Sequence, residues 1–96
     1  MLDDKDFHAD GIWLKRTCYA SPEQYDAFDE HGRQVGYLRL RDGCFTVDCP
    51  DVSVEEVLSA APLGDGVFEP QEREGWLRKA IDAIKAWKRK RDREAP

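Results

Sequence analysis

Long apolar runs are missing from this sequence of 96 residues, of which 36% are charged and 41% hydrophobic. No stretch approaches the roughly 18 apolar residues that a membrane-spanning helix needs, so no membrane partner is expected. The first residues, Met1 to Asp6, are acidic, whereas a secretory signal peptide starts with positive charge and continues with an apolar segment. We therefore expect a cytoplasmic protein.

Cysteine is scarce, and three copies are an odd number, so a complete intramolecular disulfide framework cannot form. Cys18, Cys44 and Cys49 could in principle bind zinc together with His31, but Cys44 and Cys49 are five residues apart, and such positions on one continuous strand point to opposite faces. The densest carboxylates, Asp48 and Asp51, lack the fixed series of oxygen ligands that a calcium loop requires. The sequence therefore predicts no metal and no cofactor.

Catalytic motifs are missing as well. The sequence has no nucleophile elbow, no Walker loop, no zinc-protease helix motif and no dinucleotide fingerprint. His8 falls in the N-terminal segment and His31 at a predicted hairpin tip, without a plausible nucleophile nearby. We predict that this protein is not an enzyme.

Charge is distributed unevenly along the chain. Residues 1–69 hold 6 Lys and Arg against 15 Asp and Glu, whereas residues 70–96 hold 9 against 5. The first part is therefore strongly acidic and the second basic. An acidic body repels phosphate backbones at long range, although a local basic patch can still bind them.

Three segments have the β-branched and aromatic content of strands, namely 12–19, 24–29 and 34–41. The turn-forming pair Asp42-Gly43 then predicts a two-residue hairpin, in which Arg41 faces Cys44. This register brings four apolar residues onto one face, and it places Tyr37 and Arg39 on the other. The agreement between turn and pattern makes this hairpin the best local signal in the sequence.

The remainder of the chain predicts one further element of uncertain type and a helix. Residues 52–61 fit either a short helix or an edge strand, and we prefer the strand. A helix is expected from Pro70, because the apolar residues from Trp76 to Trp87 fall within one arc. Residues 88–96 are predicted to be a basic, fraying helix end, and residues 1–10 a flexible acidic lead-in.

These elements predict an α+β fold in a single domain over residues 11–87. Four or five antiparallel strands form a meander, and the C-terminal amphipathic helix packs on one face. The expected core consists of Leu38, Leu40, Phe45, Val47, Leu77, Ile81 and Ile84.

The block Tyr25-Asp26-Ala27-Phe28-Asp29, followed by residues 34–41, resembles small bacterial proteins of unknown function. In that family a similar block precedes a Gly-Asp-Gly-x-Phe loop, here residues 64–68, and a C-terminal helix. The resemblance covers about residues 24–87. It implies the same architecture and carries no assigned activity.

The uncovered sheet face is the first candidate site. Tyr37, Arg39 and Arg41 are residue types enriched where proteins bind one another. A simpler interpretation is a wet sheet face on which Arg39 forms a cross-strand pair with Asp48. The position of Trp13 discriminates between these interpretations, since its presence on the same face would expose an unusual apolar area.

The basic helix end is the second candidate site, with Lys88, Arg89, Lys90 and Arg91 as possible phosphate contacts. These cations encircle the helix axis, whereas a nucleic-acid-binding helix normally gathers them on one face, and cations are also favoured at helix C-termini. We therefore predict a protein-binding module that uses the open sheet face or a sheet edge. The alternatives are a nucleic-acid-associated protein and an acidic inhibitor that masks a partner's phosphate-binding surface.

Overall fold

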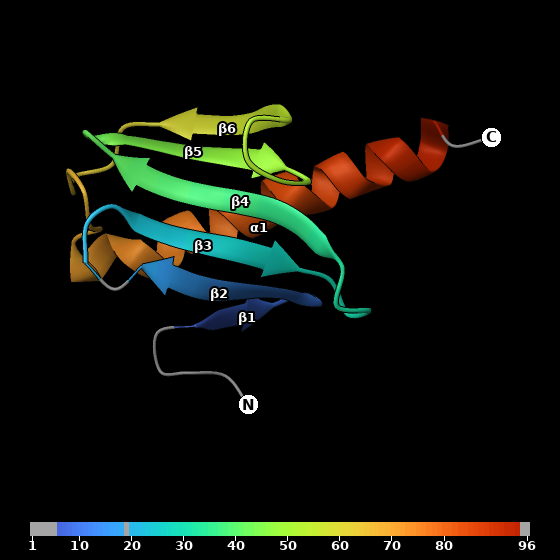
Figure 1. Cartoon of the computed structure of the whole chain (residues 1–96), viewed down its shortest axis with the longest axis horizontal. Coiled ribbons are helices and arrows are strands. Elements are labelled where there is room, and N and C mark those ends of the chain that lie inside the picture. The colour runs from blue at the N-terminus through green and yellow to red at the C-terminus, as the bar shows by residue number, and fades with distance from the viewer. Residues whose placement is uncertain (1–5, 19, 95–96) are drawn as a thin grey trace.

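The structure, a computed structural model, describes residues 6–18 and 20–94, and this part of the chain forms six strands and one helix. Each strand pairs antiparallel with the next, so the order in the sheet equals the order in the chain (Figure 1). This arrangement confirms the predicted α+β fold, with slightly more strands than expected. The elements are β1 (Phe7–Ala9), β2 (Ile12–Cys18), β3 (Glu23–Phe28), β4 (Gln34–Arg41), β5 (Cys44–Cys49), β6 (Glu55–Ala60) and α1 (Pro70–Glu94).

The additional strand β1 lies in the segment predicted to be a flexible lead-in. Asp10 and Gly11 have φ angles of 53° and 78°, and this tight turn pairs Phe7 with Leu14. The Asp-Gly pair is the same signal that predicted the hairpin at residues 42–43. It was overlooked at residues 10–11 because the aspartates around it suggested a solvated segment; residues 1–5 lie outside the described part.

The central hairpin has the register expected from its turn. Asp42 and Gly43 both have positive φ angles, of 53° and 74°, as a primed turn requires. Arg41 pairs with Cys44, Leu40 with Phe45 and Tyr37 with Asp48. Residues 55–60 form the preferred edge strand, β6, which pairs with β5.

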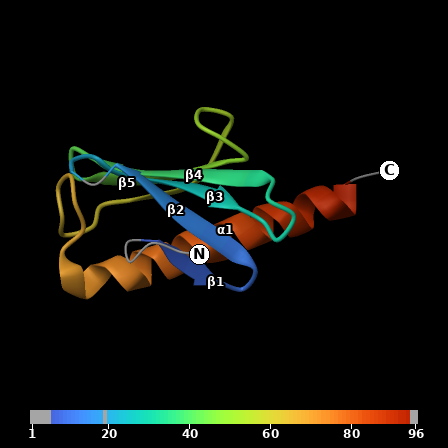
Figure 2. The same cartoon turned by 60° about the horizontal axis from the view of Figure 1, so that its bottom comes forward.

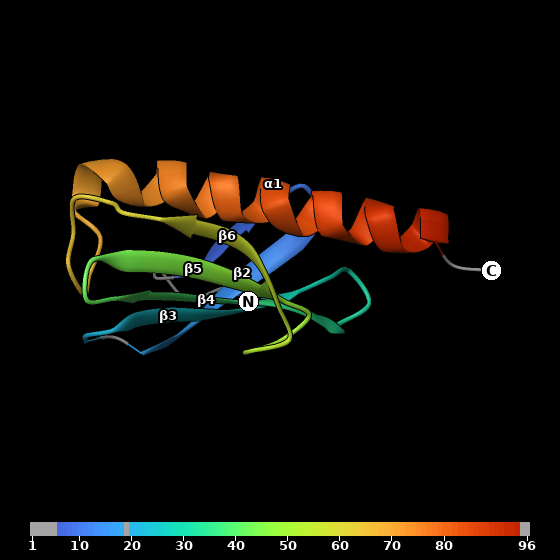
Figure 3. The ribbon, with the colours of Figure 1, turned by 90° about the horizontal axis from the view of Figure 1, so that it is seen from above.

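Helix α1 crosses one face of the sheet and leaves the other uncovered (Figures 2 and 3). The predicted core is confirmed, because all seven of its residues are buried between the helix and the sheet. Gly36 lies where the helix approaches the sheet closely, since a Cβ atom there would lie 2.9 Å from Cδ1 of Ile84. Further buried apolar residues complete the core: Ile12, Leu14, Tyr25, Ala27, Val35, Cys49, Phe68 and Ala80.

The helix continues to Glu94 and includes residues that the sequence predicted to fray. Its charged C-terminal turns extend past the end of the sheet (Figure 1). In the described chain, no helix is both long enough and apolar enough to cross a membrane.

Candidate functional site

The uncovered sheet face carries all three residues predicted for the first site. Tyr37 and Arg39 are half-buried on β4, with their neighbours on β3 and β5 beside them. Arg41 is exposed at the end of the strand, where its Nε atom lies 3.8 Å from a carboxylate oxygen of Asp42. Register therefore brings Tyr37, Arg39 and Arg41 into one row along the strand.

Trp13 lies on this same face, which the sequence left undecided. Lys15 pairs with Asp26, and Asp26 pairs with Tyr37, so alternate residues of β2 share the face of Tyr37. The imidazole of His8 stacks on the Trp13 indole, with ring centroids 4.1 Å apart and an interplanar angle of 18°. An aromatic row therefore adjoins the predicted site.

Phe28 extends that row, because it pairs with Trp13 across β2 and β3. Sequence reasoning missed His8 and Phe28 as members of the site. The sequence of β3 shows alternating apolar and polar residues, but only the pairing of β2 with β3 shows which β3 residue lies beside Trp13.

The predicted pair between Arg39 and Asp48 does not form. The carboxylate of Asp48 instead accepts a hydrogen bond from the backbone N–H of Ser53 at 2.9 Å. Arg39 and Lys15 make no ion pair or hydrogen bond with another residue of the described chain. The interpretation of this face as a set of cross-strand pairs therefore does not account for its cations.

Asp26 lies between Lys15 and Tyr37 on this face. Its side chain accepts a hydrogen bond from the Gln34 amide at 3.3 Å, and the same amide donates to Asp51 at 3.1 Å. Partial burial and the nearby charge of Asp51 raise the pKa of Asp26, and the bond from Gln34 opposes them. Gln34 thus holds the two carboxylates close to each other.

The basic helix end is brought against acidic residues of the sheet turns. The Lys88 ammonium lies 3.6 Å from the Asp29 carboxylate, and Lys85 lies 3.1 Å from Asp10. The Arg91 guanidinium lies over the Trp87 ring, 5.0 Å from its centroid. The remaining two residues of the predicted patch, Arg89 and Lys90, are exposed.

Two shallow clefts flank this part of α1, with volumes of about 240 and 290 Å³. Both include Lys88 and Asp92, and the larger is also lined by Asp29, Arg33 and Trp87. The walls of both clefts contain cationic and carboxylate side chains together. The clefts are therefore a less favourable place for a phosphate than a purely basic surface would be.

Asp29 is the best-connected residue near the clefts. Burial raises the pKa of its carboxyl, but backbone N–H bonds from Arg33 and His31 and the charges of Arg33 and Lys88 lower it to about 2. The Arg33 Nε atom donates to the carboxylate at 3.2 Å. Asp29 thus connects the β3–β4 turn to the helix.

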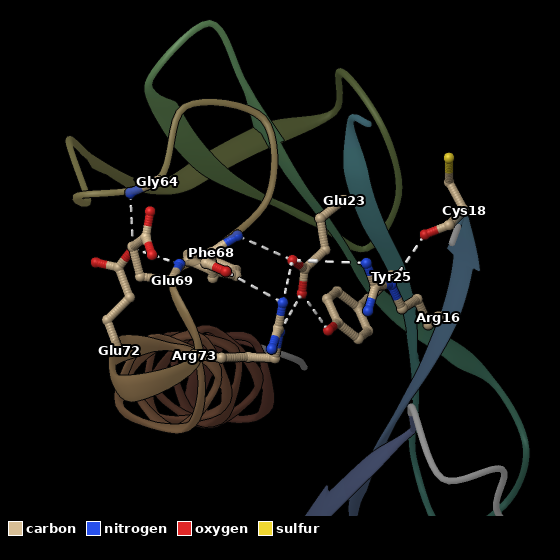
Figure 4. Close-up of polar contacts among 9 residues, drawn as sticks. All are labelled: Arg16, Cys18, Glu23, Tyr25, Gly64, Phe68, Glu69, Glu72 and Arg73. Carbon is tan, nitrogen blue, oxygen red and sulfur yellow. Dashed lines mark hydrogen bonds and ion pairs between the residues drawn. The ribbon is translucent and has the colours of Figure 1, made fainter. Parts of the chain in front are cut away.

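A buried ionic cluster, which the sequence did not predict, lies at the opposite end of α1 (Figure 4). The Glu23 side chain is fully buried, and it accepts two hydrogen bonds from Arg73, at 2.9 and 3.1 Å. It also accepts bonds from the Tyr25 hydroxyl and the Phe68 backbone N–H, and Arg16 lies 3.7 Å away. One carboxylate thus joins β2, β3, the loop before α1 and the first turns of the helix.

Burial raises the pKa of Glu23, but the bonds from Arg73, Tyr25 and Phe68 and the charge of Arg16 outweigh it and lower the pKa. The same burial and the neighbouring carboxylate raise the pKa of Tyr25. No acid or base in this cluster is free to exchange a proton with a substrate. Its arrangement therefore indicates a structural role.

Glu72 has a similar structural role in the first turn of α1. Its carboxylate accepts backbone N–H bonds from Leu63, Gly64 and Glu69, at 2.8, 2.7 and 3.0 Å. The indole of Trp76 donates to it as well. The Gly-Asp-Gly loop is thus held on the helix N-terminus as a bend (Figure 4).

The three cysteines do not form a common site. All three are free; Cys44 is exposed and Cys49 is buried. Burial and the charges of Glu55 and Asp48 raise the pKa of Cys49 to about 12, which makes it a poor nucleophile. Within the described residues, no group of three or more His, Cys, Asp or Glu side chains could hold a metal ion.

Comparison with protein-family models, curated proteins and solved structures finds no match to this chain.

Proposed function

We propose that this chain is a non-catalytic protein-binding module whose open sheet face binds another protein. The single observation that carries the proposal is the position of Trp13. It lies beside the surface formed by Tyr37, Arg39 and Arg41, on the side of the sheet opposite α1. Aromatic and arginine side chains together are typical of the residues that contribute most to binding at protein interfaces.

The face is a better candidate than either sheet edge. The β6 edge carries Glu55 and Glu56, and the β5–β6 pairing has a bulge next to Asp48. Charged residues and bulges are devices by which natural sheets prevent pairing with another strand. The opposite edge, β1, has three residues and offers little backbone for pairing.

Two contacts make the nucleic-acid alternative less favourable. Lys88 and Lys85 are each within ion-pair distance of an aspartate of the same chain, so a phosphate would have to compete for them. Arg89 and Lys90 are exposed and have no ion-pair partner among the described residues. The inhibitor alternative requires a basic partner and does not depend on these helix cations.

The proposal is tested with variants of the full chain that retain the core. A Tyr37→Ala, Arg39→Ala, Arg41→Ala variant should melt near the parent temperature, because all three side chains lie outside the core. It should lose the protein that the parent chain retains from native lysate. The matched variant Lys88→Gln, Arg89→Gln, Lys90→Gln, Arg91→Gln should retain that protein.

The opposite pattern supports nucleic-acid binding: the helix variant loses the partner with a reduced salt dependence, and the sheet-face variant retains it. Loss of binding in a variant that has unfolded reports nothing about contact, so a thermal melt accompanies each pull-down. Retention of the partner by a well-folded sheet-face variant would overturn the proposed function.

A further inference from the structure

We infer that the partner presents an acidic segment to the open face, an extended stretch in which carboxylates lie near an apolar side chain. This inference rests on the proposed function and adds the chemical class of the partner. It rests on a comparison of the side chains at the centre of this face: several hydrogen-bond donors have no acceptor among the described residues, whereas the carboxylates already accept hydrogen bonds.

On β2 and β4, the unoccupied groups of this face are hydrogen-bond donors. Among the described residues, Lys15 and Arg39 have no ion-pair partner, and the Trp13 indole N–H and the Tyr37 hydroxyl have no acceptor. These four side chains come from alternate positions of β2 and β4, on either side of β3. A partner that satisfies them must supply acceptors, and carboxylates form the strongest hydrogen bonds with guanidinium and ammonium groups.

Three carboxylates at the centre of this face already have donors from this chain, whereas Glu56, which pairs with Asp48, lies exposed at the β6 edge without one among the described residues. Asp48 accepts the Ser53 backbone N–H at 2.9 Å, and Asp51 accepts the Val52 backbone N–H at 2.7 Å. The Gln34 amide donates to Asp51 and to Asp26, at 3.1 and 3.3 Å. Over β2 to β4, a basic partner would compete with these internal bonds, whereas an acidic partner would meet donors that no other described residue occupies.

The spacing of the donors fits an extended chain. Trp13 and Arg39 are two strands apart in the sheet and four residues apart along it. At about 4.8 Å per strand and 3.3 Å per residue, their Cα atoms are about 16 Å apart. About five extended residues cover that distance, so an apolar side chain on the row of Trp13 and Phe28 places a carboxylate at Arg39.

The net charge of this protein, −5, opposes an acidic partner at long range. Screening limits that opposition, because the Debye length at physiological ionic strength is about 8 Å. Hydrogen bonds and ion pairs between this face and the partner are shorter than the Debye length, so screening weakens them little. We therefore expect the partner to associate without electrostatic acceleration and to be held by short-range pairs.

The inference is tested with two synthetic peptides of the same length. Both share a Leu-Phe anchor, and they differ only in a following run of glutamates or of lysines. In a titration followed by ¹H–¹⁵N NMR, the glutamate peptide should shift the Trp13 indole N–H and the Arg39 Nε–H. The lysine peptide should bind at least about 10-fold more weakly, since its ammonium groups cannot accept hydrogen bonds from Arg39 and Lys15.

Two variants with opposite expected effects test whether the bound segment is negatively charged. Arg39→Gln should weaken binding of the glutamate peptide about 10-fold, and Asp26→Asn should strengthen it severalfold by removing the central carboxylate. Arg78→Gln is the matched control, because Arg78 is an exposed arginine on α1 that pairs with Glu74. It should leave binding unchanged.

Stronger binding of the lysine peptide to this face would overturn the acidic class of partner and leave the proposed function standing. Shifts confined to Lys88 through Arg91, or no shifts with either peptide at millimolar concentration, would also overturn the inference. A different result would overturn the proposed function: the folded sheet-face variant would retain the natural partner.

Discussion

Single residues decide how this small domain is held together, and Glu23 is the clearest case. Sequence patterns gave no reason to bury a glutamate at the start of β3. Its carboxylate is completely enclosed because arginines from β2 and α1 and two further donors surround it. A charge can be buried at acceptable cost only when its partners are supplied in this way.

Glu23→Gln should therefore destabilise the protein by about 3 kcal/mol, because it leaves the partly buried Arg73 guanidinium without its counter-charge. The measurement is the urea midpoint at neutral pH. Glu74→Gln is the control, since it removes one carboxylate from an exposed pair with Arg78. That change should cost less than about 1 kcal/mol. Equal midpoints for the two variants would contradict a stabilising role for the buried cluster.

At the scale of elements, local signals were most informative where they reinforced one another. The turn at Asp42-Gly43 and the alternation on both sides of it predicted the β4–β5 register residue by residue, and the structure confirms it. The apolar arc of α1 likewise predicted which residues are buried. The same type of turn at Asp10-Gly11 led to no hairpin prediction, because the aspartates around it suggested a solvated segment and the three-residue strand before it has little pattern of its own.

Gly43→Val should destabilise the hairpin by about 1 to 3 kcal/mol, because a β-branched residue resists the φ angle of 74° at this position. Cys44→Val, one position later, should have a much smaller effect, since Cys44 is exposed in a regular strand. Thermal melts of both variants check this difference. A Gly43→Val variant as stable as the parent would indicate a different turn.

At the scale of the whole molecule, each end of α1 is attached to the sheet by an ion pair between a helix cation and a carboxylate of β3 or the turn after it. The first end is held through Glu23, and the second end through the contact of Asp29 with Lys88. The basic end is therefore not simply a solvated tail. Lys88, at its start, contacts Asp29 of the β3–β4 turn, although the sequence separates the two residues by more than half the chain.

The attachment through Asp29 should depend on pH. The pKa of Asp29 is about 2 in the folded protein, below its ordinary value of 3.8. Its ionised form therefore stabilises the fold above about pH 4, and this contribution is lost as pH falls towards 2. Asp29→Asn should be less stable than the parent at neutral pH, and the difference should narrow on acidification.

Urea midpoints of both proteins at about pH 6 and about pH 2.5 check this expectation. Glu30→Gln is the matched control, because Glu30 is the exposed neighbour of Asp29 and contacts His31 at the turn. It should follow the parent at both pH values. A difference between Asp29→Asn and the parent that stays constant with pH would contradict the expectation.

The sequence by itself determined the α+β class, the central hairpin, the core and the extent of the helix to about Trp87. These features follow from turn chemistry and periodicity, which act between residues near one another in the chain. It also placed Tyr37, Arg39 and Arg41 together, since one strand carries all three.

Tertiary structure alone decided which residues from different strands become neighbours. Trp13 joined the face of Tyr37 only through the pairing of β2 with β3, and its stacking with His8 required β1. Glu23 accepts hydrogen bonds from Arg73, which lies fifty residues away in the chain. Such contacts depend on strand register and helix placement over long separations, which no local periodicity encodes, because shifting a strand by one residue exchanges its two faces.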